Sequence, residues 1–417
     1  MKEDKKVPQL RFPEFTDAWK QRELGEIAER VTRRNSSLES QTPLTISAEY
    51  GLIDQNKFFG KRIAAKDLSN YYLIQKGEFA YNKSTSNDAP WGAIKRLDCY
   101  NNGALSTLYI VFKIKDNKSC YSDFLVTYYG TSLWHKGVKE IATEGARNHG
   151  LLNVSPSDFF RTKLVIPQDF EEQRKIGAFF TQLDNTITLQ QRKLNSLQKL
   201  KKGLLQKMFP KNGKNIPEIR FPEFSDAWKQ RKLGDILKLL KDGTHGSHKD
   251  VTNGHYLLSA KNIKDGRIFW DKTDRIISDE DYKKIHSTFK INKGDVLLTI
   301  VGSIGETAIF NVSEEITFQR SVAILRPIDE VSSDFLYSEI TSPKFQKFLN
   351  LNKSTSAQPG IYLGDLANIS FSFPENKEEQ KMIGRLFTDL NSTITLQQRK
   401  LESLQKLKKG LLQQMFI

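Results

Sequence analysis

The sequence EEQRKIGAFFTQLDNTITLQQRKLNSLQKLKKGLLQKMF, residues 171–209, occurs a second time as EEQKMIGRLFTDLNSTITLQQRKLESLQKLKKGLLQQMF, residues 378–416. Thirty of these 39 positions are identical, at an offset of 207. A second pair of blocks precedes them: residues 8–27 and 217–236 share 15 of 20 positions, at an offset of 209. Agreement of this length does not arise by chance, so the chain is a tandem duplication.

Two variable segments, residues 28–166 and 237–373, lie between the repeated blocks and are 139 and 137 residues long. They share only short stretches of similar sequence, such as Lys-Gly-Glu at 76–78 and Lys-Gly-Asp at 293–295, each after an alternating apolar stretch. We therefore predict one shared fold with two divergent surfaces. Each half consists of a constant lead-in, a variable domain and a constant tail, and two copies are too few for a solenoid.

The two tails are predicted to be long helices that pair as a coiled coil, because their apolar residues recur at alternating spacings of three and four. Two near-identical seams in one chain most simply pair with each other, and the chain connection favours an antiparallel pair with a pseudo-twofold axis. A helical hairpin that only supports the core is the alternative, but the identity extends to surface positions such as Gln191 and Arg192. The predicted seam is Ile176, Phe180, Leu183, Ile187, Leu194, Leu197, Leu204, Met208, Ile383, Phe387, Leu390, Ile394, Leu401, Leu404, Leu411 and Met415.

Other residues of the constant blocks bear on how the tails are placed. A helix of 39 residues is at most ~58 Å long, enough for a rigid bar that holds two domains apart. Gly203 and Gly410 interrupt the helices at some cost, which we interpret as sites where another backbone approaches closely. In the lead-in, Phe12, Phe15 and Trp19 are spaced as on one face of a short helical turn, and we expect this aromatic face to dock against the bar or the base of its own domain.

Composition limits the class of protein. The chain has 417 residues, of which 38% are hydrophobic and 27% charged, and this is typical of two or three globular domains. Its formal net charge of +15 favours a polyanionic partner, with nucleic acid as the first candidate and a merely basic protein as the alternative. The two 39-residue tails carry +5 and +3 of this excess, so the variable domains are less basic than the bar.

Cysteine content and hydropathy exclude further classes. Cys99 and Cys120 are the only cysteines, which excludes a disulfide scaffold and a four-cysteine zinc site and suits a reducing cytoplasm. The first residues lead into no apolar core, so we expect no secretory signal. No apolar run approaches the ~20 residues that span a bilayer, so we expect a cytoplasmic protein with no membrane partner.

No catalytic constellation is evident. The sequence contains no Pro-Pro dipeptide, hence no Asn/Asp-Pro-Pro-aromatic motif of amino-methyltransferases, and no Gly-x-x-x-x-Gly-Lys-Ser/Thr phosphate loop. The glycine cluster at 302–305 lacks the lysine and is predicted to be a turn after a buried strand at 296–301. His245, His248 and His255 could bind a metal, but no cysteine is near, and a surface polar loop is the preferred interpretation. We predict no catalytic residues, no metal site and no cofactor in this chain.

Polar loops in both variable segments carry the side chains that hydrogen-bond base edges and phosphates. A solvated loop is the alternative for each of them. The candidate DNA-binding residues are Lys83, Ser84, Thr85, Asn87, Arg147, Asn148 and His149 in the first segment, and Thr244, His245, Ser247, His248, Lys249, Ser354, Thr355, Ser356 and Gln358 in the second.

Each tail begins with the same signature, Ile-Pro…Glu-Gln…Ile at 166–176 and Phe-Pro…Glu-Gln…Ile at 373–383. With this signature, and with the alternation of constant and variable regions over essentially the whole chain, the protein resembles the DNA-specificity (S) subunits of type I restriction-modification systems. Asp-Gly-Thr-His at 242–245 and Asn-Ile…Gly at 262–266 are also similar to that family. Where the family usually has Pro-Pro after the signature, this chain has Gln-Asp and Glu-Asn, a departure that concerns only the entry into the helix.

The resemblance implies an α+β protein with two target-recognition domains of mixed α/β fold, held apart by two long antiparallel coiled-coil helices in a pseudo-twofold tandem duplication. The expected domains are 1–166 and 217–373, each with its lead-in, separated by a first spacer helix and linker at 167–216 and followed by a second spacer helix at 374–417. Each domain is expected to read one half of a bipartite, asymmetric site in double-stranded DNA. If both domains enter grooves on one face of the DNA, their centres should lie roughly 34–36 Å apart.

The same resemblance implies the partners. The spacer helices would set the distance between half-sites and dock two methyltransferase (M) subunits, and restriction (R) subunits would complete the enzyme. S-adenosylmethionine would belong to the M subunit, and ATP with Mg²⁺ to the R subunit, so this chain would be a non-catalytic subunit without a cofactor. Two other classes stay open: a self-sufficient nuclease or methyltransferase would turn over DNA by itself, and a coiled-coil scaffold that binds only proteins would show no salt-sensitive DNA binding.

Overall fold

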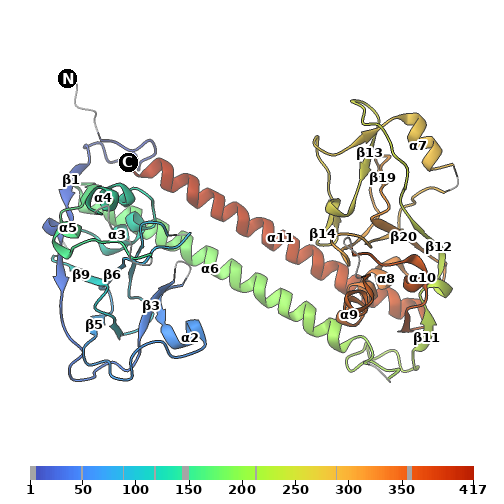
Figure 1. Ribbon diagram of the computed structural model, residues 1–417, viewed down its shortest axis with the longest axis horizontal. Coiled ribbons are helices and arrows are strands. Elements are labelled where there is room, and N and C mark those ends of the chain that lie inside the picture. Colours follow the sequence, from blue (N-terminus) through green and yellow to red (C-terminus); the bar gives the residue numbers. More distant parts are fainter. Residues whose placement is uncertain are drawn as a thin grey trace. The chain divides into compact units, whose positions relative to one another are not determined.

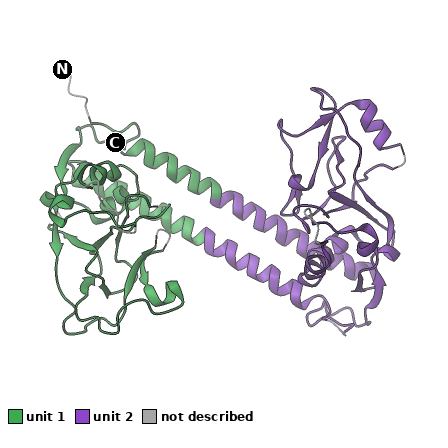
Figure 2. Cartoon of the chain, viewed as in Figure 1, with its two compact units in different colours: residues 1–189, 402–417 green, residues 190–401 purple. Residues whose placement is uncertain are grey.

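The computed structural model describes residues 6–47, 50–87, 89–116, 119–142, 150–211, 214–287, 289–354 and 359–417. The chain forms two compact units, which Figure 2 shows in different colours. The first unit is Met1–Leu189 with Glu402–Ile417, and the second unit is Gln190–Leu401. Each unit therefore contains one variable segment together with a part of each constant tail.

A four-stranded antiparallel sheet, in the order β2-β9-β6-β7, is the centre of the first unit (Figure 1). Two-stranded sheets β3-β4, β5-β8 and β1-β10 accompany it, and the last of these pairs the lead-in with the strand that precedes the long helix. The strands are β1 (Lys20–Glu23), β2 (Ala28–Val31), β3 (Leu44–Ser47), β4 (Gly51–Asp54), β5 (Tyr72–Gln75), β6 (Phe79–Asn82), β7 (Ala93–Arg96), β8 (Asn102–Leu105), β9 (Ile110–Ile114) and β10 (Lys163–Ile166). The short helices are α1 (Leu24–Ile27), α2 (Gln55–Phe59), α3 (Ser122–Tyr129), α4 (Trp134–Ile141) and α5 (Pro156–Phe160).

Aromatic residues at alternate positions build the core of the first unit. β6 reads Phe-Ala-Tyr-Asn, and aromatic and β-branched residues of this kind favour a buried, pleated strand. Phe79 of β6 stacks on Phe112 of β9, with 5.2 Å between ring centroids, and Tyr81 stacks on Phe159 of α5 at 4.8 Å. Each such ring contributes roughly 1.5–3 kcal/mol by leaving water, so helix α5 is held against the sheet.

The second unit also has a four-stranded antiparallel sheet, β12-β20-β17-β18. It is accompanied by a three-stranded sheet β16-β13-β19, in which β13 and β19 run parallel, and by the two-stranded pairs β14-β15 and β11-β21. The strands are β11 (Lys229–Lys232), β12 (Leu237–Asp242), β13 (His255–Leu258), β14 (Ile263–Lys264), β15 (Arg267–Ile268), β16 (Ile276–Ile277), β17 (Val296–Thr299), β18 (Thr307–Ile309), β19 (Thr317–Phe318), β20 (Val322–Pro327) and β21 (Ser370–Phe373). The short helices are η1 (Gly234–Ile236), η2 (Ala260–Asn262), α7 (Asp279–Ile285), α8 (Ser333–Ile340), α9 (Pro343–Asn352) and α10 (Leu363–Ala367).

The two variable segments share a fold, as predicted, although few residues match. β2 pairs with β9 and β9 with β6 in the first unit, and β12 pairs with β20 and β20 with β17 in the second. The short stretches of similar sequence mark the turns before β6 and β17. Glu78 of the first turn accepts two hydrogen bonds from the guanidinium of Arg33, at 2.9 and 2.8 Å, and Asp295 of the second accepts two from Arg326, both at 2.8 Å. Each turn thus binds an arginine through its carboxylate: Arg33 follows β2, and Arg326 lies in β20.

The predicted long helices are α6 (Phe170–Lys207) and α11 (Lys377–Met415), and each begins in one unit and ends in the other (Figures 1 and 2). In the first unit, Phe180 of α6 contacts Phe416, with ring centroids 6.0 Å apart. One turn further along α6, Asp184 forms an ion pair with Lys408. Because the residue number of the partner falls as that of α6 rises, the two helices are antiparallel in this unit.

The second unit gives the same direction. Phe209, just after α6, contacts Phe387 of α11 with 5.9 Å between centroids, and the side chain of Gln397 donates a hydrogen bond to that of Gln190. The sixteen residues of the predicted apolar seam are all buried or half-buried in the two units. The Gln190–Gln397 bond lies at a seam position that is polar in both repeats, and it pairs the buried amide of Gln397 with the half-buried amide of Gln190.

A buried carboxylate ties each lead-in to the start of a long helix. Glu172, in the first turn of α6 and fully buried, accepts hydrogen bonds at 2.6 and 2.7 Å from the guanidinium of Arg11 and one at 3.2 Å from the indole N–H of Trp19. A carboxylate in the first helical turn is also favoured by the helix dipole. In the second unit the same three contacts are made by Glu379, Arg220 and Trp228.

The glutamine of the signature ties the same helix turn to the variable domain. Gln173 accepts a hydrogen bond from the N–H of Tyr121, the residue before α3, at 2.8 Å, and donates to the carbonyl of Pro167 at 2.9 Å. Gln380 bonds to the N–H of Ser332, before α8, and to the carbonyl of Pro374 in the same way. The Pro…Glu-Gln signature is therefore the joint between lead-in, domain and helix.

The aromatic residues of the lead-in dock as expected, but not from a helix. Trp19 packs edge-on against Phe124 and Phe416, while Phe12 meets Phe179 and Phe15 lies under the ammonium of Lys175, both on α6. The expected helical turn is wrong, because residues 6–19 form turns and irregular structure. Pro13 between the first two aromatic residues and the turn bond from Phe15 N–H to Phe12 carbonyl (3.1 Å) account for this.

The expected close backbone approach at Gly203 and Gly410 is also wrong, since a β-carbon at either glycine would meet nothing within 4 Å. The close approach is at Gly177, where a β-carbon would lie 2.6 Å from the backbone nitrogen of Phe124. Gly384 has the same relation to Phe335, at 2.8 Å. The glycines let α6 and α11 cross the first turns of α3 and α8 at a distance that no side chain permits.

No helix among the described residues is long and apolar enough to cross a membrane. No group of three or more histidine, cysteine, aspartate or glutamate side chains among them is placed to hold a metal ion.

Candidate nucleic-acid interface

The loop after β6 carries the first group of candidate residues. Thr85 donates hydrogen bonds from its N–H and its hydroxyl to the carbonyl of Gly150, at 2.6 and 2.9 Å, and Leu152 donates its N–H to the carbonyl of Lys83 at 3.0 Å. The loop is thereby tied to segment 150–152. The candidates Arg147, Asn148 and His149 directly precede that segment and lie outside the described residues. The candidates in the loop, all exposed or half-buried, are Lys83, Ser84, Thr85 and Asn87.

Positive charge gathers at the base of this loop. Burial lowers the pKa of Lys83, and the charge of nearby Arg30 lowers it further. The Lys83 ammonium lies 3.4 Å from the carbonyl of Val154. Two cations held close together favour an anionic partner that neutralises both.

The loop after β12 carries the second group of candidates. Thr244 donates its N–H to the carbonyl of Phe318 at 2.8 Å and accepts at its own carbonyl from the N–H of Arg320 at 3.1 Å. Arg275 donates to the carbonyl of His248 at 2.6 Å, which fixes the far side of the loop. The candidates here are Thr244, His245, Ser247, His248 and Lys249.

The histidines of this loop have different surroundings. The ring of His248 is only 8% exposed; its Nε2 lies 2.9 Å from the hydroxyl of Thr244, and its Nδ1 lies 3.2 Å from the carboxylate of Asp281. His245 is 62% exposed, with Nε2 2.6 Å from the carboxylate of Asp242. His248 is thus placed to order the loop, whereas His245 faces solvent.

The candidate loops of the second unit meet at one edge of its central sheet, where β12 and β17 end and β20 begins. Ile300 donates its N–H to the carbonyl of Ser321, and Ile361 donates to the carbonyl of Ile300, both at 2.9 Å. Ser354 donates to the carbonyl of Gly360 at 2.9 Å. Loop 244–249, Ser354 and residues 360–361 therefore border the same edge. The candidates Thr355, Ser356 and Gln358 lie outside the described residues.

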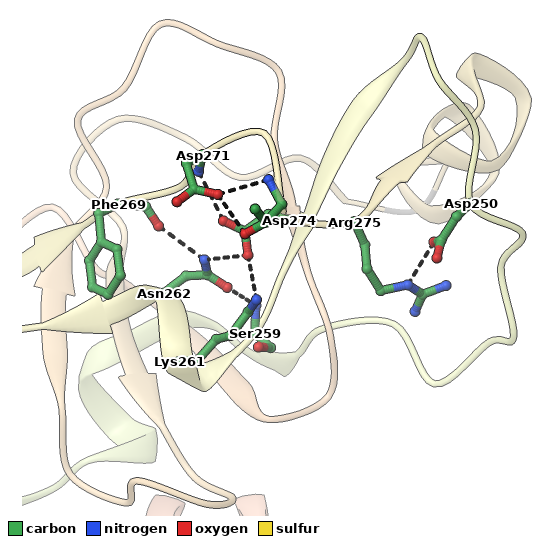
Figure 3. Close-up of polar contacts among 9 residues, drawn as sticks. Asp250, Ser259, Lys261, Asn262, Phe269, Asp271, Asp274 and Arg275 are labelled. Carbon is green, nitrogen blue, oxygen red and sulfur yellow. Dashed lines mark hydrogen bonds and ion pairs between the residues drawn. The ribbon is translucent and has the colours of Figure 1, made fainter.

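The loop after β13 is fixed beside this edge (Figure 3). Asn262, which is 1% exposed, donates to the carboxylate of Asp274 at 3.0 Å, and the ammonium of Lys261 lies 2.7 Å from the same carboxylate. The N–H of Ala260 donates to the hydroxyl of Ser321 at 3.0 Å. Asn262 and Ile263 of the Asn-Ile…Gly motif noted in the sequence are therefore buried and fix the loop beside the candidate interface.

The sequence alone does not single out Arg320, a charged residue at this edge. It lies between β19 and β20, is exposed, and its guanidinium makes no hydrogen bond or ion pair with any residue that the structure describes. A lone arginine between two strand-like stretches gives no signal by itself. Only the pairing of β20 with β12 brings it beside Thr244.

A sequence model of the family described as "Type I restriction modification DNA specificity domain" matches residues 16–199 and, a second time, residues 225–406. The chain belongs to this family. It is a tandem of two specificity domains, and the resemblance drawn from the repeated signature is confirmed.

Relatives agree with the family. The "Type I restriction enzyme MjaVIII specificity subunit" of Methanocaldococcus jannaschii is 25% identical over 307 residues, covering 71% of this chain and 70% of the relative. The "Type I restriction enzyme EcoBI specificity subunit" of Escherichia coli is 26% identical over 173 residues, covering 40% of this chain and 35% of the relative. The crystal structure of a type I restriction-modification S subunit from M. genitalium covers 99% of both chains with a TM-score of 0.65 at 14% identity, so the two share a fold.

Proposed function

We propose that this specificity-family protein is the DNA-recognition subunit of a type I restriction-modification complex, in which each specificity domain reads one half of a bipartite site. One observation carries the proposal: two copies of one scaffold present different loops at corresponding sheet edges. A scaffold used twice with different edges suits a site whose halves differ in sequence. Base edges in the major groove distinguish all four base pairs, so polar side chains at such an edge can select sequence.

The helices α6 and α11 are proposed to set the number of unread base pairs between the half-sites and to dock two methyltransferase subunits. Their antiparallel pairing in each unit and their excess of basic residues support this assignment. Restriction subunits would complete the assembly in the cytoplasm. In this proposal S-adenosylmethionine binds the methyltransferase subunit and ATP with Mg²⁺ the restriction subunit, and this chain contributes recognition without catalysis.

The test of half-site reading is a map of methylated adenines in DNA from cells that carry this chain with its methyltransferase subunit. Replacing residues 28–166 with the corresponding segment of another family member should change one half of the methylated sequence and leave the other unchanged. The matched control replaces residues 237–373 and should change the opposite half. Sequence-independent methylation, or both halves changing in either exchange, would contradict the proposal and favour a protein-binding scaffold.

The spacer assignment has its own test. Inserting seven residues into both α6 and α11 keeps the seam in register and adds about 10 Å to each helix. At about 3.4 Å per base pair, the unread gap should lengthen by about three base pairs, with both half-sites unchanged. A four-residue insertion in one helix alone is the control, because it breaks the seam and should abolish methylation. An unchanged gap in the double insertion would refute the spacer role.

A further inference from the structure

A hollow of about 470 Å³ opens on the surface of the first unit beside the edge where β2 ends and β9 begins. Its lining consists of one guanidinium, one amide, and hydroxyl-bearing side chains that include Ser36 and Thr107, and no lining residue among those described is acidic. A hollow whose charged side chain is an arginine, and whose other polar side chains can donate hydrogen bonds, suits an anionic ligand.

Arg34 supplies the positive charge and is held in place without a carboxylate. Its guanidinium carbon lies 4.9 Å from the centroid of the Tyr72 ring, and its Nη1 donates to the carbonyl of Asn70 at 2.6 Å. It forms no ion pair with any described residue. The stacking and the single bond orient the guanidinium, and its other N–H groups stay available to a ligand.

A second cation lies close to this hollow. The guanidinium of Arg30 donates to the hydroxyl of Tyr72 at 3.2 Å, so Arg30 and Arg34 contact the same side chain. Arg33, between them in sequence, is instead neutralised by Glu78. Residues 30–34 thus pair one arginine with a carboxylate and leave Arg30 and Arg34 for an external anion.

The second unit has a corresponding arginine on the opposite strand end. Val31 of β2 pairs with Val111 of β9, and Lys241 of β12 pairs with Ile324 of β20. Arg34 follows the end of β2, and Arg320 precedes the start of β20, where its N–H donates to the carbonyl of Thr244 at 3.1 Å. Each domain therefore has an arginine at this end of its central sheet, on opposite members of the corresponding strand pairs.

We propose that the hollow holds a phosphate of the DNA backbone, bound by Arg34 with Arg30 close by, and that Arg320 binds a backbone phosphate at the corresponding edge of the second domain. The proposal rests on the proposed function, because it names the contact that fixes each domain on its half-site. Phosphate contacts position a protein on DNA, whereas base contacts specify the sequence. With one arginine each, on opposite members of the corresponding strand pairs, both domains would make the same kind of phosphate contact, while the residues around it that read bases would differ.

The experiment uses this chain in complex with its methyltransferase subunit and DNA that contains both half-sites. The dissociation constant is measured over a range of salt concentrations for the wild type, Arg34→Gln, Arg34→Lys and the control Arg161→Gln. Arg161 is an arginine of the same domain whose side chain is 74% exposed and 3.9 Å from its nearest acid. We expect Arg34→Gln to weaken binding about tenfold and to lower the slope of log K against log salt by about one. Arg34→Lys should restore the slope, Arg161→Gln should change neither quantity, and Arg320→Gln should behave as Arg34→Gln does.

Other results would overturn the proposal. If the slope of log K against log salt is unchanged in Arg34→Gln, Arg34 makes no phosphate contact. If the same variant methylates a less specific sequence, Arg34 reads a base instead. Free phosphate has the same chemistry, so the wild-type complex is also titrated with inorganic phosphate at constant ionic strength. Tight binding that Arg34→Gln abolishes, with DNA affinity unchanged, would show a small-anion site instead.

Two controls keep the test decisive. If Arg34→Gln lowers the melting temperature of the complex, the double variant Ser36→Ala with Thr107→Val replaces it, since both side chains are exposed. This double variant should weaken DNA binding severalfold at an unchanged slope, and full affinity would overturn the proposal. A wild-type complex that methylates no bipartite site would refute the proposed function itself. If instead the wild type methylates a bipartite site and Arg34→Gln binds DNA as the wild type does, only the phosphate contact is refuted.

Discussion

The carboxylate of Glu379 accepts two hydrogen bonds from the guanidinium of Arg220, at 2.7 and 2.8 Å, across 159 residues of sequence. Both side chains are almost fully buried, at 1% and 10% exposure. A bidentate pair of this kind compensates for the removal of two charges from water only while both partners are present. The lead-in and the long helix therefore depend on one another.

Glu379→Ala should lower the free energy of unfolding by about 3–5 kcal/mol, because it leaves the Arg220 guanidinium buried without its partner. The measurement is urea unfolding of the full chain followed by tryptophan fluorescence, since Trp228 contacts the same carboxylate. The control is Glu378→Ala, whose exposed pair with Lys381 should contribute no more than about 1 kcal/mol. Equal losses in the two variants would show that the buried pair has no special importance.

Two glycines of helix α6 should respond oppositely to alanine. At Gly177 the new β-carbon would lie 2.6 Å from the backbone nitrogen of Phe124, which cannot move without shifting α3, so we expect a loss of about 1–3 kcal/mol. At Gly203 the β-carbon meets open space, and alanine should raise stability by about 0.5–1 kcal/mol. Melting temperatures of the two variants, measured side by side, check both signs.

The amide pair of the seam should show strong coupling. Gln397→Leu alone leaves the side chain of Gln190 without its donor in a largely buried position and should cost about 1–3 kcal/mol. Changing both residues to leucine removes the unsatisfied group and should recover most of that loss. A double-mutant cycle by urea unfolding measures the coupling, and additive losses would contradict the proposed mutual satisfaction.

Glu339 of α8 predicts a pH dependence of stability. It is 3% exposed, and burial raises its pKa to about 8 from an ordinary value near 4.5. Above pH 4.5 the unfolded chain loses this proton while the folded chain keeps it, so the free energy of unfolding falls as pH rises from 4.5 to 8. At about 1.4 kcal/mol per pKa unit, the group accounts for a loss of about 4 to 5 kcal/mol over that range.

Glu339→Gln should remove this dependence. Its free energy of unfolding should match that of the wild type near pH 4 and exceed it increasingly up to pH 8. Urea unfolding of both proteins at several pH values gives the difference, in which the other titrating groups cancel. Parallel curves for the two proteins would mean that Glu339 is ionised in the folded chain.

The helices and the duplication could be predicted from sequence because they depend on local periodicity and on identity between the repeats. The joint could not, since Arg11 and Glu172 are 161 residues apart and neither has a local pattern that names its partner. The placement of the close-approach glycines failed for the same reason: Gly203 and Gly177 look alike in sequence, and only the crossing of α3 distinguishes them.

The candidate interface divides in the same way. Polar loops such as 83–87 and 244–249 could be predicted, because their composition is visible and each follows a strand. Arg34 and Arg320 could not be predicted, because the pairing of β2 with β9 and of β12 with β20 places them at the edge. Local composition does not reveal which strands pair. The structure is therefore most informative about residues on short irregular segments between strands, whose spatial neighbours the sequence does not predict.

Met415 and Phe416 are among the last residues of the chain, yet their side chains complete the core of the first unit. A ribosome releases a protein from its N-terminus, and domains generally fold in that order as they emerge. Here residues 28–166 emerge first but lack these two core side chains until translation has passed residue 416. A nascent chain stalled earlier would expose the aromatic pocket formed by Trp19 and Phe124. The half of the protein that is made first thus completes its core only after the second variable segment has been made.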